Sequence, residues 1–228
     1  MGPEFFSYAD AAAERRGYTM REIAVKKFPA IAVIEFSSIA DGIFTTDAIL
    51  KKAPIAMIQS GTVSGGRYLT IFGGTTGSVS ESLSEALVIG AGSVLDHAFL
   101  PDVHPKVHDA ALGKHTECTQ EAVAILETDT VSANIRAAEA AIKGTEVVLV
   151  EIRVAEYEMS GKAISVYNGE LHEIETAMAI ANDALRGRSA FTHHRIIARP
   201  HENVTRQLDA TTRFAEAKPH ELEGEEAS

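Results

Sequence analysis

The chain contains an internal repeat, and this repeat limits its possible folds more than any other feature. Residues 32–58 align without a gap on residues 124–150, at an offset of 92 residues, and Lys51 falls on Lys143. Each half then ends on a segment with proline and histidine, FLPDVHPKV in the first and IIARPHENV in the second. Solenoid repeats have periods of about 20–50 residues, so this spacing indicates something else. The sequence predicts two tandem copies of one small domain.

Each half shows the same order of apolar runs, caps and turns. The apolar run 30–36 predicts a buried strand, Ser37 and Ser38 can cap the helix that follows, and Pro54 prevents that helix from continuing. The other expected elements of the first half are strands 55–60, 67–72 and 94–100 and a helix 77–91. Those of the second half are strands 122–128, 146–154, 162–167 and 192–198 and helices 131–143 and 170–186. This β-α-β-β-α-β order predicts an α/β fold, an α+β sandwich of two tandem ferredoxin-like domains.

The repeat also sets the expected domain boundaries. The expected parts are an N-terminal extension 1–29, a first domain 30–112, a linker 113–121, a second domain 122–208 and a tail 209–228. The tail holds six acidic residues against Arg213 and Lys218, a composition typical of a solvated, disordered segment.

Charge and cysteine content exclude several classes of protein. Lys and Arg number 21 and Asp and Glu 32, and this net charge of −11 argues against a nucleic-acid or anionic-membrane partner. The single cysteine, Cys118, excludes an internal disulfide framework and a thiolate zinc site within one chain. No apolar run reaches the ~20 residues of a membrane span, and the N-terminus lacks the pattern of a secretory signal. The simplest setting is the cytoplasm.

No arrangement of residues in the sequence predicts catalysis. The nine histidines form no HExxH motif, the GGTTGS turn lacks the lysine of a phosphate-binding loop, and there is no GxSxG serine. We therefore expect no enzyme activity, no cofactor and no metal.

Several phrases resemble the shell proteins of bacterial microcompartments when taken in their order along the chain. They are DAILK, SGGRY, GTTGSV and RPH, and the resemblance covers about residues 30–208. Two fused copies resemble the tandem class of this family, in the unpermuted order of elements. The resemblance implies a homotrimer that forms a pseudohexagonal tile of six domains, with a central pore for small metabolites and edge-to-edge contacts with other shell proteins. It places the chain in the shell of a cytoplasmic microcompartment, where the acidic tail is a candidate contact for lumen enzymes.

The resemblance also assigns residues to the pore. In the family the loop between the second and third strands lines the pore, which gives Ser64, Gly65, Gly66, Met159, Ser160 and Gly161. The charged residues that flank these loops are Arg67, Glu156, Glu158 and Lys162, and we expect Glu156 and Glu158 to make one pore face acidic. Tandem shell proteins of propanediol-utilisation compartments hold an iron–sulphur cluster on a cysteine in the first loop. Because Ser64 stands at that position and serine is a poor ligand for such a cluster, no cluster is expected here.

The tile edges have their own residues in the family. Lys51 and Lys143 match the lysine that packs against its counterpart on a neighbouring tile. Arg199 matches the edge arginine, with His201 beside it, and Leu100 is expected at the place of that arginine in the first half. The alternative to a shell role is a trimeric ferredoxin-like regulator that binds a small molecule between its subunits, since fold alone does not decide function.

Overall fold

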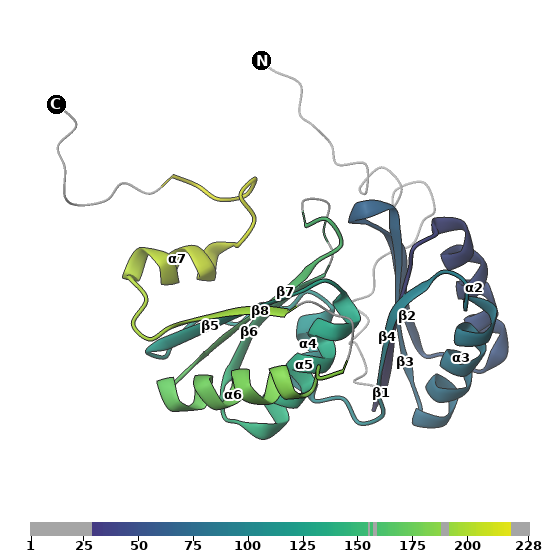
Figure 1. Cartoon of the computed structure of the whole chain (residues 1–228), viewed down its shortest axis with the longest axis horizontal. Coiled ribbons are helices and arrows are strands. Elements are labelled where there is room, and N and C mark those ends of the chain that lie inside the picture. The colour runs from purple at the N-terminus through teal and green to yellow at the C-terminus, as the bar shows by residue number, and fades with distance from the viewer. Residues whose placement is uncertain (1–28, 155, 157–158, 188–191, 220–228) are drawn as a thin grey trace, which may run out of the picture.

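A computed structural model describes residues 29–154, 156, 159–187 and 192–219. These residues form two similar units in tandem, each with one four-stranded antiparallel sheet and two long helices (Figure 1). The predicted fold class and the order of elements are confirmed. Among the described residues, no helix combines the length and the apolar character that a membrane span needs.

The first unit has a sheet in the order β2-β3-β1-β4. Side chains of Ser38 and Thr75 cap the two long helices by accepting backbone N–H groups, as expected for these residue types. The hairpin strands are longer than predicted, because cross-strand pairing continues to Val63, directly before the turn. The elements are β1 Ala30–Phe36, α2 Ile39–Lys52, β2 Met57–Val63, a short 3₁₀ turn Ser64–Gly66, β3 Arg67–Gly74, α3 Thr76–Ile89, β4 Val94–Leu100 and α4 Pro105–Ala111.

The second unit repeats this plan with the sheet order β6-β7-β5-β8. Thr130 caps its first helix in the way that Ser38 caps α2. The elements are β5 Ala122–Thr128, α5 Val131–Gly144, β6 Val148–Val154, β7 Ala163–Gly169, α6 Leu171–Asp183, β8 Thr192–Ile197 and α7 Glu202–Ala210.

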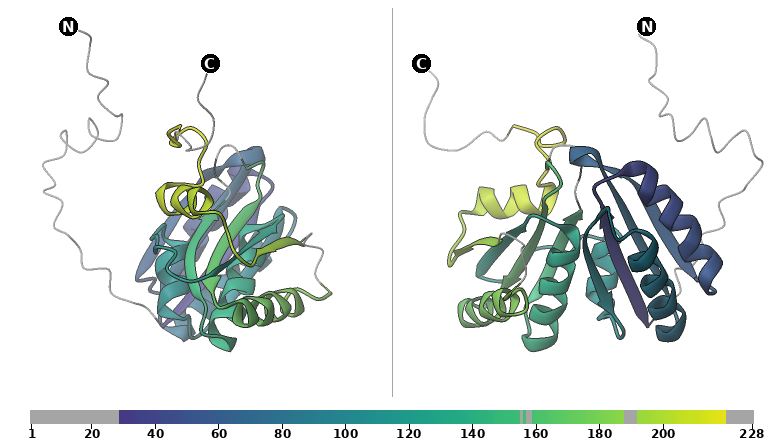
Figure 2. Two further views of the ribbon diagram at one scale, coloured as in Figure 1. Left: turned by 90° about the vertical axis from the view of Figure 1, so that its left-hand side faces the viewer. Right: turned by 45° about the vertical axis from the view of Figure 1, so that its right-hand side comes forward.

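One face of the first sheet packs against helix α5 of the second unit. Helices α2 and α3 cover the outer side of the first sheet, whereas α4 and α5 lie between the two sheets (Figures 1 and 2). One core therefore joins the inner face of the first sheet, including the buried Ile31 and Val33, to α5 and to the second sheet. The rule that a sheet must bury both faces when both are apolar explains this arrangement.

The linker and the start of the tail are packed against the second unit. Asp209 accepts a hydrogen bond from the Cys118 N–H at 2.7 Å, and Leu208 packs on the second sheet beside Val123. Thr212 donates to Glu151 at 2.6 Å. Part of the predicted tail, residues 209–219, thus lies in the described part and makes these polar contacts with the linker and the second unit. Residues 220–228 and the extension 1–28 lie outside the described part, and a disordered tail stays a prediction.

Candidate functional site

The first glycine loop is a tight turn that joins β2 to β3. Gly65 and Gly66 have φ values of 75° and 70°, a region that costs glycine little and other residues more. A side chain added at Gly66 would meet nothing within 4 Å. The turn therefore presents open backbone, as the sequence predicts for a loop that approaches other copies.

The second loop, between β6 and β7, contacts the first loop within one chain. The Gly161 N–H donates to Ser64 Oγ at 2.7 Å, and Arg67 donates to the carbonyl oxygen of Gly161 at 3.2 Å. Gly161 has a φ of 86°, and Ser160 before it also has a positive φ of 52°. Six residues assigned to the two loops thus lie together at one end of the molecule: Ser64, Gly65, Gly66, Met159, Ser160 and Gly161.

A cavity of about 630 Å³ opens beside these loops. Its lining is Thr62, Val63, Ser64, Gly65, Gly66, Val154 and Glu156. Both units contribute to it, so the sequence-predicted loops make one joint surface rather than two separate hairpins.

Glu156 is held by two arginines. Arg153 donates to its carboxylate at 3.0 Å, and Arg213 from the tail donates to it at 2.8 Å. Burial alone would raise the pKa of Glu156, but the hydrogen bonds from Arg213 and Arg153 outweigh it and hold that pKa below its usual value. The charge of Glu156 is thus compensated within the chain, while Glu158 lies outside the described residues, and an acidic pore face stays a prediction.

Lys162, the other charged residue predicted beside the second loop, is paired inside its own unit. Its ammonium lies 2.6 Å from the carboxylate of Glu127, and this hydrogen bond, with the charge of the carboxylate, raises the pKa of Lys162.

The two predicted edge lysines lie at the ends of equivalent helices. Lys51 pairs with Asp47 at 2.5 Å, and Lys143 pairs with Glu139 at 2.6 Å. Lys143 also donates to the backbone carbonyl of Asp102, which brings the closing segment of the first unit to the edge of the second.

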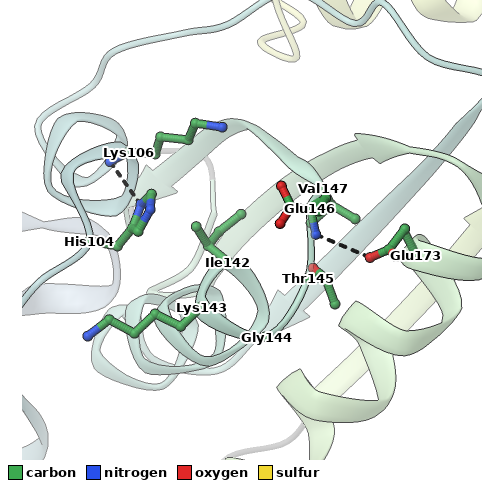
Figure 3. Close-up of a pocket in the computed structure, with 9 residues that line it drawn as sticks. All are labelled: His104, Lys106, Ile142, Lys143, Gly144, Thr145, Glu146, Val147 and Glu173. Carbon is green, nitrogen blue, oxygen red and sulfur yellow. Dashed lines mark hydrogen bonds between the residues drawn. The ribbon is translucent and has the colours of Figure 1, made fainter.

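A polar hollow of about 440 Å³ marks this second edge (Figure 3). The backbone N–H of His104 donates to both carboxylate oxygens of Glu139 at 3.1 Å. The lining residues are His104, Lys106, Ile142, Lys143, Gly144, Thr145, Glu146, Val147 and Glu173.

The strand register corrects the expected counterpart of Arg199. Leu100 pairs with Ile31 in the first sheet, and Ile197 pairs with Val123, the counterpart of Ile31 at the 92-residue offset, in the second. Leu100 therefore matches Ile197, and the residue that matches Arg199 is Asp102. The sequence comparison was wrong here because it aligned the two prolines rather than the two strands. His201 matches His104, since each caps the helix after it through Nδ1.

The helices α2 and α5 differ in burial although they match in sequence. Ile39, Ile43 and Leu50 on α2 are 37%, 55% and 50% exposed. Their counterparts on α5 pack between the two sheets, and none is more than 6% exposed: Val131, Ile135 and Ile142. A group of large apolar side chains on α2 is thus left without the packing that α5 has.

Both halves of the chain match the BMC domain, over residues 30–103 and 122–200. This chain belongs to the BMC domain family of bacterial microcompartments. It is accordingly a structural shell protein, which functions in the shell of a microcompartment inside the bacterial cytoplasm.

Individual relatives match this shell protein over most or over part of its length. The bacterial microcompartment shell protein PduT of Citrobacter freundii is 31% identical over 179 residues, which are 78% of this chain and 97% of the relative. The carboxysome shell protein CcmK2 of Synechococcus elongatus is 34% identical over 88 residues, 36% of this chain and 80% of the relative. A crystal structure of a microcompartment protein from Desulfitobacterium hafniense has 31% identity and a TM-score of 0.68, and the match covers 78% of this chain and 98% of that one.

The cysteine of this shell protein lies away from both loops. Cys118 is half-buried in the linker, where burial and the neighbouring Asp209 carboxylate raise its pKa to about 12. A thiol held protonated in this way is a poor metal ligand and a poor nucleophile. Among the described residues, no three His, Cys, Asp or Glu side chains are grouped so that they can hold a metal ion.

Sequence reasoning missed two groups of contacts in this shell protein. Arg153 and Arg213 fix the second loop, but they are far apart in sequence and only the packing of the tail brings them together. Glu35 is buried at the contact between the units, where one carboxylate oxygen accepts the Ser132 N–H at 2.7 Å. The alignment of Glu35 with Glu127 in the repeat was the available signal for the second case.

Proposed function

We propose that three copies of this shell protein close into a ring of six domains with a central pore. In this ring, α2 of each copy packs on the second sheet of its neighbour, as α5 packs on the first sheet within one chain. The single observation that carries the proposal is the exposed apolar face of α2, with Ile43 more than half exposed where its counterpart Ile135 is fully buried. A large exposed apolar patch on a protein surface commonly marks an interface.

The second sheet carries the matching residues, and Leu208 of α7, which packs beside Val123 in the single chain, has to give way to α2 of the neighbour. Val123, Ile125 and Glu127 are the counterparts of Ile31, Val33 and Glu35, the residues on the face of the first sheet that packs on the second unit. Packing α2 of a neighbour there would place the N–H of Ala40, the counterpart of Ser132, near Glu127. The same contact that joins the two units inside the chain would then join two chains.

Helix α7 supports the same arrangement. Its counterpart α4 buries Val107, His108, Ala110 and Ala111 against the second unit. All of α7 lies in the described part of the chain, and none of its residues is buried. We infer that α7 of one copy reaches α2 of the next, so that His201 and Arg199 approach Lys51 there.

In this ring the loops Ser64–Gly66 and Met159–Gly161 line the pore. The positive φ values of the glycines and the open space at Gly66 suit a place where several copies of one loop meet on an axis. Small polar metabolites are the expected solutes, since backbone N–H groups and Ser160 face them. The role is one of structure and passage without catalysis, and the edge lysines Lys51 and Lys143 face other shell tiles. Contact between the tail and lumen enzymes is part of the same proposal, for residues 220–228 beyond the described part.

The test of this function is the mass of the purified protein in solution, together with electron microscopy. We expect a particle three times the 24.4 kDa chain mass, with a hexagonal outline that assembles into flat sheets. A monomer that forms no sheets, or a discrete oligomer with one tightly bound small ligand, would contradict it.

The pore is tested by narrowing it. Gly66→Asn adds a side chain at a position with space for it, and asparagine tolerates positive φ. We expect lower single-channel conductance of the tile in a planar bilayer, with the three-chain mass unchanged. Gly113→Asn, at another glycine with a positive φ (88°) where an added Cβ meets nothing within 4 Å, is the matched control. Equal conductance of the two variants would refute the placement of the loop.

A further inference from the structure

The two kinds of edge on the proposed tile carry different charges. The edge of the second unit, which we call the Lys143 edge, consists of the hollow in Figure 3 together with Asp102 and Glu139. Its charged residues are Lys106 and Lys143 against Asp102, Glu139, Glu146 and Glu173. The acidic residues exceed the basic ones by two.

The edge of the first unit, which we call the Lys51 edge, is made of the counterparts of these residues. Strand register and helix caps give the correspondence: Asp102 with Arg199, Lys106 with Asn203, Lys143 with Lys51, Gly144 with Lys52, Glu146 with Pro54 and Glu173 with Ser78. Asp47 pairs with Lys51 and Glu85 pairs with Lys52, so both lysines are compensated. Arg199 comes from the adjacent copy in the ring together with the exposed Glu202, so this edge has no net charge, against an excess of two acidic residues on the Lys143 edge.

The difference is concentrated at exposed positions. Asp102 and Arg199 are both exposed, as is Glu146, so each can face a neighbouring tile without a change in the fold. Lys106 opposes the trend, because its counterpart Asn203 is neutral. Glu85 and Glu202 oppose it as well, because their counterparts Ile180 and Pro105 are neutral. The substitutions at Asp102, Gly144, Glu146 and Glu173 make the Lys51 edge more positive and the Lys143 edge more negative.

Geometry decides which edges can meet. A tile with threefold symmetry and six sides alternates its two kinds of edge, so opposite sides are always unlike. In a flat sheet in which every tile has the same orientation, each contact therefore joins a Lys51 edge to a Lys143 edge. Contacts between like edges require a neighbour turned by 60°, and three mutually adjacent tiles cannot all be turned relative to one another in this way.

We propose that the Lys51 edge docks on the Lys143 edge of a second copy of the tile, with Arg199 facing Asp102 and Glu146. This inference rests on the proposed trimer and adds the partner and the polarity of its lateral contact. Single exposed ion pairs contribute little, but charge complementarity selects partners and disfavours like-charged surfaces, and it acts at all six edges. The contact is sensitive to salt, because at 0.15 M ionic strength charges are screened over about 8 Å.

Charge reversal at one edge and then at both provides the experiment. Arg199→Glu makes both edges negative, and Asp102→Lys/Glu146→Lys gives the Lys143 edge a positive charge that faces Arg199. The combination of all three substitutions restores opposite signs with the polarity exchanged. Each variant is purified as full chain, its mass is measured, and its sheets are examined by electron microscopy and by pelleting at several salt concentrations.

The expected results separate the lateral contact from the trimer. We expect all variants to keep the three-chain mass, both single-edge variants to pellet roughly tenfold less at low salt, and the triple variant to recover. Image averages of wild-type sheets should show one tile orientation throughout. Unimpaired sheets from both single-edge variants, or no recovery in the triple variant, would overturn this inference and leave the trimer intact. Absence of a trimer in the wild type would overturn both proposals.

Discussion

Helices α2 and α5 are both 14 residues long and end in lysine-bearing turns, but their surroundings differ completely. Ten residues of α5 are buried against four of α2. The apolar residues at their shared positions are alike, so the helices themselves do not cause the difference. What differs is the neighbour: α5 has the first sheet against it, and α2 has open solvent.

The chain therefore contains one complete contact between its two domains. It also carries the two surfaces of a second contact of the same kind, α2 and the second sheet, which do not meet within one chain. Glu35 accepts the Ser132 N–H in the complete contact, while Glu127 at the equivalent place turns to Lys162 instead. Closing these surfaces on other copies would bury α2 as α5 is buried.

The largest effect is expected from a charge on the exposed face of α2. Ile43→Asp would bury an unpaired carboxylate in the proposed contact between copies, which is strongly unfavourable. We expect the mass in solution to fall about threefold, to a single chain, with the helix and strand content unchanged by circular dichroism. Val88→Asp, at a 76% exposed apolar residue of α3, is the control and should stay assembled.

The second prediction places a matched change in the buried counterpart. Ile135 is fully buried, so Ile135→Ala should lower the free energy of unfolding by about 2–5 kcal/mol. We propose to measure this by urea denaturation in the monomeric Ile43→Asp background, where assembly does not contribute. Leu50→Ala, at a half-exposed residue of α2 in the same background, should cost less than about 0.5 kcal/mol. Similar costs at the two positions would show that α2 is not exposed in the single chain.

The fold was predictable from the sequence because local signals specify its elements, and because these signals occur in both halves of the repeat. The apolar run 30–36, the caps Ser38 and Thr130 and the stop at Pro54 each specify an element without reference to distant residues. The repeat then allows one half to check the other. Only the hairpin ends and helix ends differ, where cross-strand pairing decides the boundary.

The candidate site was less predictable, because its contacts join residues that are distant in sequence. Ser64 and Gly161 were both identified as loop residues, but only packing of the two units brings them within hydrogen-bond distance. The pairing of Glu156 with Arg213 depends on the part of the tail before residue 220. The acidic composition of the tail gave no sign of this contact. The counterpart of Arg199 required the strand register, since short proline–histidine segments align in more than one way.

The third prediction concerns the buried carboxylate of the complete contact. Burial raises the pKa of Glu35 above its usual value of 4.5, although the Ser132 N–H opposes this. The folded chain then holds a proton that the unfolded chain releases first. Glu35 thus favours folding below about pH 4.5, and this stability is lost as the pH rises through the raised pKa.

Thermal unfolding of Glu35→Gln at several pH values checks this sign. We expect the melting temperature of the variant relative to wild type to rise between pH 4.5 and pH 8. In the monomeric Ile43→Asp background, the matched variant Glu127→Gln removes only a partly exposed ion pair with Lys162, which contributes about 0–1 kcal/mol. A relative melting temperature of Glu35→Gln that falls as the pH rises would contradict the assignment.

The smallest effect is expected where the tail meets the second loop. The ion pair between Arg213 and Glu156 is about one-third exposed, so Arg213→Ala should cost less than about 1 kcal/mol of global stability. The loop should nevertheless open more often, because Glu156 keeps only Arg153 as a partner. Hydrogen exchange should therefore accelerate at the N–H groups of Met159 and Lys162, which bond within this loop, and stay unchanged in Ser64–Gly66.

The control for this last change is Arg186→Ala, which removes an equally local ion pair with Asp183 far from the loops. It should leave exchange at Met159 and Lys162 as in the wild type. If Arg213→Ala also leaves these two amides unchanged, the tail does not hold the second loop. The second loop would then differ from the first only in its length, and not in being held by the tail. The tail would then contribute to the contact between domains rather than to the pore.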